Sequence, residues 1–123
     1  KGQTMSALYD SLPKTYGSPT MAPHCADEKK YGVVDEMIAA YTQANARGDK
    51  IMGLSIRDLV TVNGVRVTLA DGTWGLVRAS SNKPELVVVV ESPTSEANMR
   101  AIFADIDARL GKFPEVGEYN QKI

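Results

Sequence analysis

Hydrophobic and polar positions alternate in the middle of the chain, as they do in a half-buried β-strand. Val65, Val67 and Leu69 are apolar, and polar residues lie between them. Asn63-Gly64 directly precedes this segment and is the strongest hairpin signal in the chain. The pattern therefore predicts a hairpin in which a strand over 58–62 turns back into the alternating one.

Two further strands are predicted after this hairpin. A turn over 70–73 leads into a strand that begins at Trp74, and a continuous apolar run follows at 86–90. The unbroken run predicts a central strand that is covered on both faces. Residues 51–56 are apolar but interrupted by Gly53, so they predict either an additional short strand or a turn of helix.

A helix is predicted before the strands, because apolar residues recur there at three- and four-residue spacing. The residues expected in its buried stripe are Tyr31, Val34, Ile38 and Tyr41, with Val33 and Met37 beside them. Asp27 is expected to cap this helix, and Arg47-Gly48 to end it. Ligand binding between the rings of Tyr31 and Tyr41 is an alternative, but core packing is favoured.

A second helix is predicted after Pro93, with Thr94 as its N-cap and Gly111 at its end. Its apolar face consists of Met99, Ile102, Phe103, Ile106 and Leu110. Two amphipathic helices and a meander of strands need one another to bury their apolar faces.

The two ends of the chain are less regular. Residues 5–12 predict a short helix that Pro13 ends, and residues 14–19 have the composition of a linker, so a hinge is expected over 13–18. Residues 20–25 predict a first strand at a sheet edge, because Pro23 cannot donate a ladder hydrogen bond. The segment 112–123 shows no clear period and is assigned no element.

The expected fold is α+β: a single antiparallel sheet of about four to five strands with two helices packed on one face, in the order β-α-β-β-β-β-α. Three regions are expected. Residues 1–17 form a linker and helix from a preceding domain, residues 18–111 form the domain, and residues 112–123 form a C-terminal tail.

Composition narrows the functional classes. A net charge of −1 gives no basic surface for nucleic acid or an anionic membrane, so neither is expected as a partner. Cys25 is the single cysteine, which excludes an intrachain disulfide and favours a cytoplasmic location. His24 adjoins it, but a metal site needs more ligands, so a structural or solvent-exposed role is expected for both. The chain begins without methionine and is interpreted as a fragment of a longer protein.

One loop has the chemistry of an oxyanion receptor. It follows the strand from Trp74 and contains Arg78, Ser80, Ser81, Asn82 and Lys83. The arginine fork matches phosphate geometry, the small polar side chains donate hydrogen bonds, and small residues allow consecutive backbone N–H groups to form an anion-binding nest. An ordinary polar turn with a solvated arginine at a strand end is the alternative.

Several segments around this loop resemble the C-terminal domain of the α-D-phosphohexomutases. They are Gly-Val-Arg-Val at 64–67, Asp71-Gly72, Trp-Gly-Leu-Val-Arg-Ala-Ser at 74–80, and Pro84. The resemblance runs over about 18–110 and is strongest to the phosphomannomutase/phosphoglucomutase branch. It implies that this is the fourth domain of such an enzyme, with a fold usually described as TATA-binding-protein-like.

In the family, this loop reads Arg-Ala-Ser-Asn-Thr, then a variable residue, then proline, and it binds the substrate phosphate. Arg78 and Ser80 match that motif in this chain. Ser81 stands where the family usually has asparagine, Asn82 stands where it has threonine, and Lys83 is at the variable position. The resemblance implies that these five residues bind substrate phosphate, although the contact that each of the last three makes stays open.

The resemblance also implies what the chain lacks. The family interconverts hexose 1-phosphate and hexose 6-phosphate through a bisphosphorylated sugar, with a phosphoserine and a Mg²⁺ loop in other domains. Neither loop occurs in this sequence, so no catalytic residue and no metal ligand are assigned here and the fragment is expected to be inactive. Its expected partners are mannose or glucose phosphates and the other domains of the same polypeptide.

Two alternatives remain. One is the C-terminal domain of a phosphoglucosamine-type mutase, whose loop usually reads Arg-Pro-Ser-Gly-Thr-Glu-Pro and fits Ala79 and Ser81 less well. The other is a non-enzymatic α+β interaction module, for which the chain offers no basic-aromatic strand motif.

Overall fold

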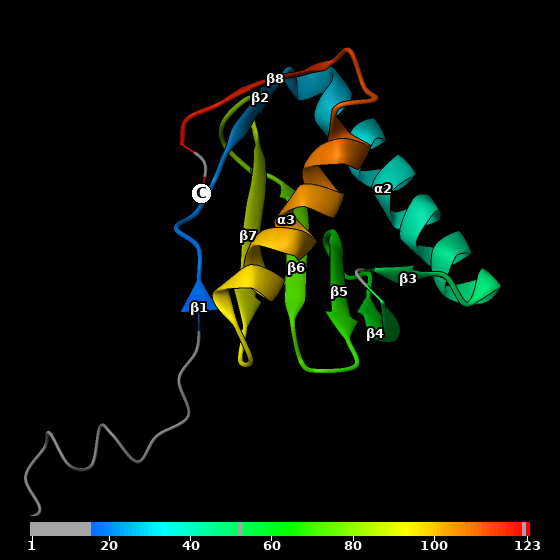
Figure 1. The fold of residues 1–123 in the computed structure, drawn as a ribbon. Helices are drawn as coiled ribbons and strands as arrows, with labels where there is room; N and C mark the ends of the chain where they lie inside the picture. The colour runs from blue at the N-terminus through cyan, green and yellow to red at the C-terminus, as the bar shows by residue number, and fades with distance from the viewer. Residues whose placement is uncertain (1–15, 52, 122) are drawn as a thin grey trace, which may run out of the picture.

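The computed structural model describes residues 16–51, 53–121 and 123. Within them a six-stranded antiparallel sheet has the order β1-β7-β6-β5-β4-β3, and a two-stranded sheet pairs β2 with β8. Figure 1 shows both sheets and the two helices. The elements are β1 (Tyr16–Gly17), β2 (Pro23–Cys25), α2 (Asp27–Arg47), β3 (Lys50–Ile51), β4 (Leu54–Val60), β5 (Val65–Leu69), β6 (Trp74–Ala79), β7 (Leu86–Ser92), α3 (Glu96–Leu110) and β8 (Val116–Tyr119).

The α+β class with an antiparallel sheet and two helices is confirmed, with more strands than expected. The hairpin at Asn63-Gly64 is confirmed as well, and Asn63 adopts a positive φ of 60°. The ambiguous apolar segment before it belongs to the sheet, because β3 folds back onto β4. The predicted helix at 5–12 lies outside the described residues.

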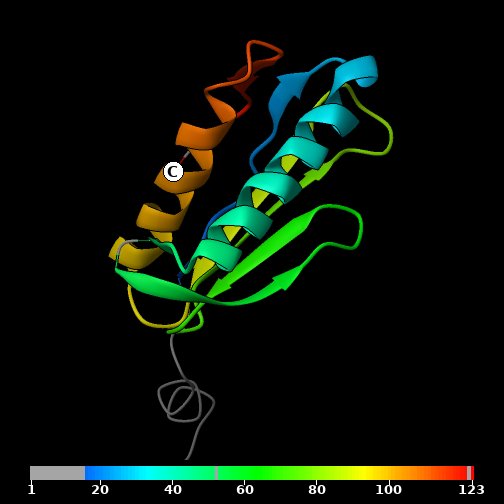
Figure 2. The same cartoon turned by 90° about the vertical axis from the view of Figure 1, so that its right-hand side faces the viewer.

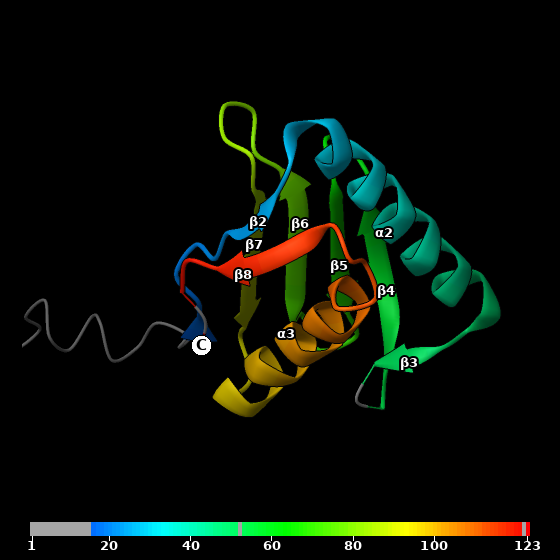
Figure 3. The same ribbon diagram turned by 90° about the horizontal axis from the view of Figure 1, so that it is seen from above.

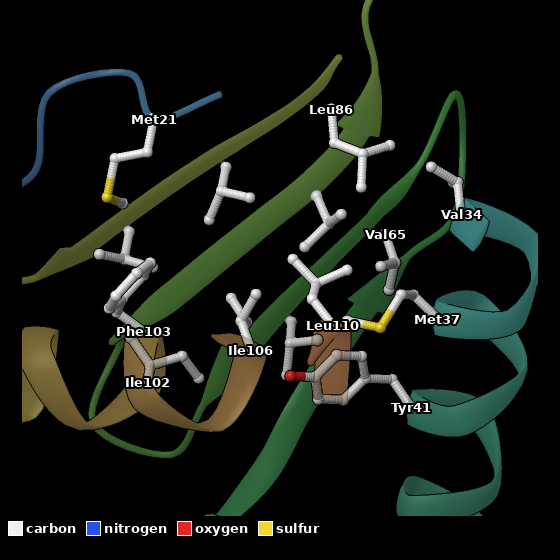
Figure 4. Close-up of a cluster of buried hydrophobic side chains, with 14 of the residues drawn as sticks. Met21, Val34, Met37, Tyr41, Val65, Leu86, Ile102, Phe103, Ile106 and Leu110 are labelled. Atoms are coloured by element: carbon white, nitrogen blue, oxygen red, sulfur yellow. The ribbon is translucent and has the colours of Figure 1, made fainter. Parts of the chain in front are cut away.

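One face of the sheet is apolar and carries both helices. Val65 lies opposite Val77, and Val77 lies opposite Val88, so the buried positions of three strands share one face. Figures 2 and 3 show α2 and α3 over the strands, with α2 against β4, β5 and β6 and α3 against β6 and β7. Side chains from both helices and from the strands form one hydrophobic cluster, shown in Figure 4.

The apolar face predicted for α3 is confirmed in full, since all five of its residues are buried. Gly75 of β6 allows this helix to approach the sheet. A Cβ at that position would lie 2.5 Å from Cδ1 of Ile106. Tyr41 links the two helices from inside the core, because its hydroxyl donates to Asp105 Oδ2 at 2.7 Å.

The predicted stripe of α2 is partly wrong. Val34 and Tyr41 are buried as expected, but the side chain of Tyr31 is 57% exposed. Lys30 is buried in its place, at 3% exposure. A ligand site between Tyr31 and Tyr41 is therefore not formed, because Tyr41 is fully buried and Tyr31 faces outward.

Both predicted helix caps are shifted by one residue. Ala26 occupies the N-cap position of α2 without a side-chain hydrogen bond, and Asp27 is the first helical residue. Ser95 rather than Thr94 caps α3, and its hydroxyl accepts from the backbone N–H of Asn98 at 3.0 Å. The predicted ends at Gly48 and Gly111 are confirmed.

Strand β7 lies next to the sheet edge instead of at the centre. Its outer neighbours are β1, which pairs with Glu91 and Ser92, and Met21, which pairs with Val88. The expected linker thus enters the sheet at Tyr16. The tail, for which no element was predicted, contains β8, and this strand pairs with the expected first strand (Figure 3).

Candidate functional site

The polar loop predicted from the sequence connects β6 to β7 at one end of the sheet. Ala79 and Leu86 form the last pair of the two strands, and residues 80–85 lie beyond it. In Figure 3 this yellow-green loop projects past the ends of the neighbouring strands. A loop in this place presents its polar groups at the rim of the domain, outside the apolar core.

The loop has a defined internal structure. The backbone N–H of Ser80 donates to the carbonyl of Glu85 at 3.0 Å and so continues the ladder by one bond. The N–H of Glu85 donates to the carbonyl of Lys83 at 2.8 Å. Ser80 is only 6% exposed, and its hydroxyl donates to Asn82 Oδ1 at 3.3 Å. Ser80 therefore shapes the loop from inside.

Two groups from outside the loop hold its second half. The backbone N–H of Cys25 donates to the carbonyl of Pro84 at 2.9 Å. The ammonium of Lys30 donates to the carbonyl of Lys83 at 2.9 Å and to Asp27 Oδ1 at 2.9 Å. Burial raises the pKa of the Cys25 thiol, which is fully buried and so behaves as a packing group.

The remaining polar side chains of the loop face solvent. Arg78, Ser81, Asn82 and Lys83 are all exposed. The guanidinium of Arg78 makes one long contact, to the carbonyl of Ala79 at 3.4 Å, and within the described residues no carboxylate lies at salt-bridge distance from it. Its donors are thus available to an external anion.

A cavity of about 610 Å³ adjoins the loop. It is lined by Tyr31, Val34, Asp35 and Ile38 of α2, by Thr61, Asn63 and Gly64 of the β4–β5 turn, and by Arg78, Ala79 and Ser81. Gly64 lies closely against the end of strand β6, since a Cβ there would lie 2.5 Å from the carbonyl oxygen of Val77 and 2.8 Å from Cβ of Arg78. The structure therefore brings Arg78 and Ser81 to one cavity. Ser80 is buried and does not line it.

Sequence reasoning missed two parts of this site. Tyr31 lines the cavity although the apolar spacing predicted it in the core, and Lys30 supports the loop although it lies in a run of charged residues. One indication in the sequence that Lys30 is buried is its position along the helix. It lies three and four residues before Val33 and Val34, which are on the buried side of α2.

What this arrangement offers chemically is anion binding. The guanidinium of Arg78, the hydroxyl of Ser81, the side-chain amide of Asn82 and the ammonium of Lys83 are all hydrogen-bond donors, and all four residues are exposed at this end of the sheet. In the described residues no group of three or more His, Cys, Asp or Glu side chains is placed to hold a metal ion. Nor does the described part of the chain contain a helix with the length and apolarity needed to cross a membrane.

Comparisons with known proteins agree with the family resemblance of the sequence and with the fold. The family model for "Phosphoglucomutase/phosphomannomutase, C-terminal domain" matches residues 24–109. A phosphomannomutase/phosphoglucomutase of Pseudomonas putida is 32% identical over 116 residues, which cover 93% of this chain and 19% of that protein. A probable phosphoglucosamine mutase of Methanothermobacter thermautotrophicus is 34% identical over 92 residues, covering 75% of this chain and 18% of that protein.

The crystal structure of a phosphoglucomutase/phosphomannomutase family protein from Burkholderia thailandensis also superposes on this fold. The TM-score is 0.59 at 28% sequence identity, over 87% of this chain and 19% of that one. The chain thus spans about a fifth of the length of the proteins that it matches.

Proposed function

Because the chain belongs to the phosphoglucomutase/phosphomannomutase family as its C-terminal domain, we propose that it binds the substrate phosphate of a hexose-phosphate mutase. One observation carries the proposal most directly. Arg78 stands at the exposed mouth of a structured loop, beside a cavity and without a carboxylate partner among the described residues.

The exposed loop residues each make a different contact with the phosphate. The fork of Arg78 meets two phosphate oxygens, Ser81 and Asn82 donate from their side chains, and Lys83 adds a second positive charge. Ser80 keeps the loop closed from within through its contact with Asn82. Oxygen atoms of a phosphate accept all of these bonds, so the group is held in one orientation.

The phosphate held here is the one that does not react. Binding it fixes the sugar in the cleft of the longer polypeptide and excludes water, which a phosphoryl transfer depends on. The serine that transfers phosphate and the residues that would hold Mg²⁺ belong to other domains, and the metal would supply positive charge to the transferred group there. The whole enzyme interconverts hexose 1-phosphate and hexose 6-phosphate, and this chain alone is inactive.

The relatives that match this chain are named for three classes of sugar phosphate: pentose, glucosamine, and mannose or glucose. The alanine at position 79 favours the mannose and glucose class over the glucosamine class, because the latter usually has proline there. Since the loop contacts phosphate, we expect this chain to bind glucose 1-phosphate and glucosamine 6-phosphate with similar affinity.

Titration of the 123-residue chain with glucose 1-phosphate tests the proposal. One loop offers few contacts, so we expect a dissociation constant of about 1 mM or weaker, worth roughly 4 kcal/mol. Backbone amide shifts should cluster at residues 78–83, and no turnover should be seen. Shifts centred near His24, or turnover of mannose 1-phosphate by this chain alone, would contradict the proposal.

A further inference from the structure

Lys30 occupies an unusual position for a lysine. In the part of the chain that the structure describes, it is the single charged residue that is buried, at 3% exposure. Lysine ordinarily extends its ammonium into water, because burying that charge is costly unless it is paired and hydrogen-bonded. The fold therefore holds this ammonium inward against its usual preference.

The partners of the ammonium explain its position. Nζ lies 2.9 Å from the carbonyl oxygen of Lys83, a residue 53 positions later in the chain, and 2.9 Å from Oδ1 of Asp27. The Asp27 side chain is 72% exposed, so this ion pair alone could form at the surface without burying the lysine. Contact with the loop carbonyl is what the buried position adds.

The direction of that carbonyl matters for anion binding. An anion is repelled by carbonyl oxygens and attracted by N–H groups, so an anion-binding loop must turn its carbonyls away. The ammonium of Lys30 donates to the carbonyl of Lys83 from the buried side of α2, in addition to the N–H of Glu85 within the loop. The N–H of Cys25 donates to the carbonyl of Pro84. Two consecutive carbonyls are thereby kept off the side on which the loop is open.

We propose that Lys30 is a positioning residue for the phosphate site. It fixes the second half of the loop in its anion-binding shape, and its charge adds a favourable potential from beneath the loop, where less water screens it. This inference rests on the proposed function of the loop. It adds a residue from α2 that lies outside the loop motif.

The test compares Lys30→Met with Lys29→Met in the 123-residue chain, using inorganic phosphate as the probe. Lys29 is the neighbouring residue on the exposed side, so both variants lose one positive charge but only one loses the loop contact. Amide shifts of residues 78–83 report the dissociation constant. We expect Lys30→Met to weaken binding by about 10-fold, the size typical of one lost hydrogen bond to a charged group, and Lys29→Met by at most about 2-fold.

Two further variants separate positioning from stability. Lys30→Arg keeps a charged donor and should recover part of the affinity, whereas Lys30→Gln keeps a donor without charge and should recover less. Melting temperatures are measured on the same samples, because a purely structural lysine would lower the melting temperature and leave the affinity of the folded chain unchanged. If Lys30→Met does not fold, the comparison of Lys30→Arg with Lys30→Gln decides, and equal affinities would overturn the inference.

The outcomes also distinguish the role proposed for Lys30 from the phosphate-binding function proposed for the loop. If wild type binds no phosphate at residues 78–83, the proposed function of the loop fails. If wild type binds there and Lys30→Met binds equally well, the loop function stands and the role given to Lys30 is wrong.

Discussion

Two polar clusters lie at opposite ends of strands β6 and β7 and use similar side chains differently. The anchor network consists of Asp71, Thr73, Ser92, Thr94 and Asn98. The anion loop consists of Arg78 and Ser80–Lys83. In the first cluster the polar groups bond to one another, and in the second most of them face solvent.

The anchor network is closed on itself. Asp71 accepts hydrogen bonds from the hydroxyl of Thr94 at 2.7 Å, the side-chain amide of Asn98 at 2.8 Å and the backbone N–H of Thr73 at 2.9 Å. The hydroxyls of Thr73 and Ser92 lie 2.8 Å apart, and both residues are fully buried. The network ties the β5–β6 turn to the start of α3.

The pKa of Asp71 reflects this closure. Partial burial by itself would raise the pKa of the carboxyl, but the hydrogen bonds from Thr94, Thr73 and Asn98 outweigh it and hold the pKa at about 2, below the usual 3.8. Among the residues that the structure describes, the side chains of Arg78 and Lys83 in the anion loop form no ion pair. Satisfied polar groups stabilise a fold, whereas exposed donors held in place are available to a ligand.

The largest effect is expected on catalysis, when the arginine of the anion loop is replaced. Arg78→Ala in the full-length enzyme should lower kcat/KM by about 10- to 100-fold or more, since a bidentate contact to a charged group is worth about 1.5–3 kcal/mol or more. Arg78→Lys should recover only part, because a point charge cannot replace the fork. Enzyme assays and melting curves on the same samples check this. A marked fall in melting temperature with normal activity would show that Arg78 is structural.

Replacing the central carboxylate of the anchor network should affect stability and not phosphate binding. Asp71→Ala removes the acceptor of three hydrogen bonds and should lower the free energy of unfolding by about 2–3 kcal/mol. Phosphate binding by the folded chain should be unchanged. Asp58→Ala is the control, because Asp58 is an exposed aspartate on β4 and its loss should change stability by less than about 0.5 kcal/mol. Urea unfolding measures both variants, and equal losses would contradict the role of the network.

Acid should weaken the anchor network through Asp71. Because the pKa of this carboxyl is lower in the folded chain than in the unfolded one, its stabilising effect is present above about pH 4 and is lost as the pH falls toward about 2. The difference in unfolding free energy between wild type and Asp71→Asn should therefore shrink over this range. Urea unfolding between pH 6 and pH 2 measures it, and a constant difference would show that the charge of Asp71 is unimportant.

The smallest effects are expected from single side chains within the anion loop. Ser81→Ala and Asn82→Ala should each weaken phosphate binding by less than about 10-fold, because backbone N–H groups of the loop remain. Amide-shift titrations of the 123-residue chain give the affinities. A loss from either variant as large as that from Arg78→Ala would shift the main contact from the guanidinium to the smaller side chains.

The sequence by itself determined the elements whose signal is local. Alternation at 65–69, the Asn63-Gly64 turn and the spacing of the second helix each reflect one element with one buried face, so the structure has all three. The types and order of the loop residues carry the family resemblance, and their role in binding phosphate stays a prediction. Cap positions were each one residue off: Ser95 rather than the adjacent Thr94 bonds the backbone of α3, and α2 begins after Ala26 with no side-chain cap at all.

Two features were decided only by the tertiary structure. One is which residue near the start of α2 is buried, and the other is the strand that the C-terminal segment forms. Lys30 is buried and Tyr31 exposed because a carbonyl of a loop far along the chain accepts from the lysine, and spacing along a helix contains no information about such a partner. Strand β8 forms because β2 offers it an unpaired edge, although its own sequence has no clear period. Local patterns fix the conformation of an element, whereas contacts between distant segments fix what it touches.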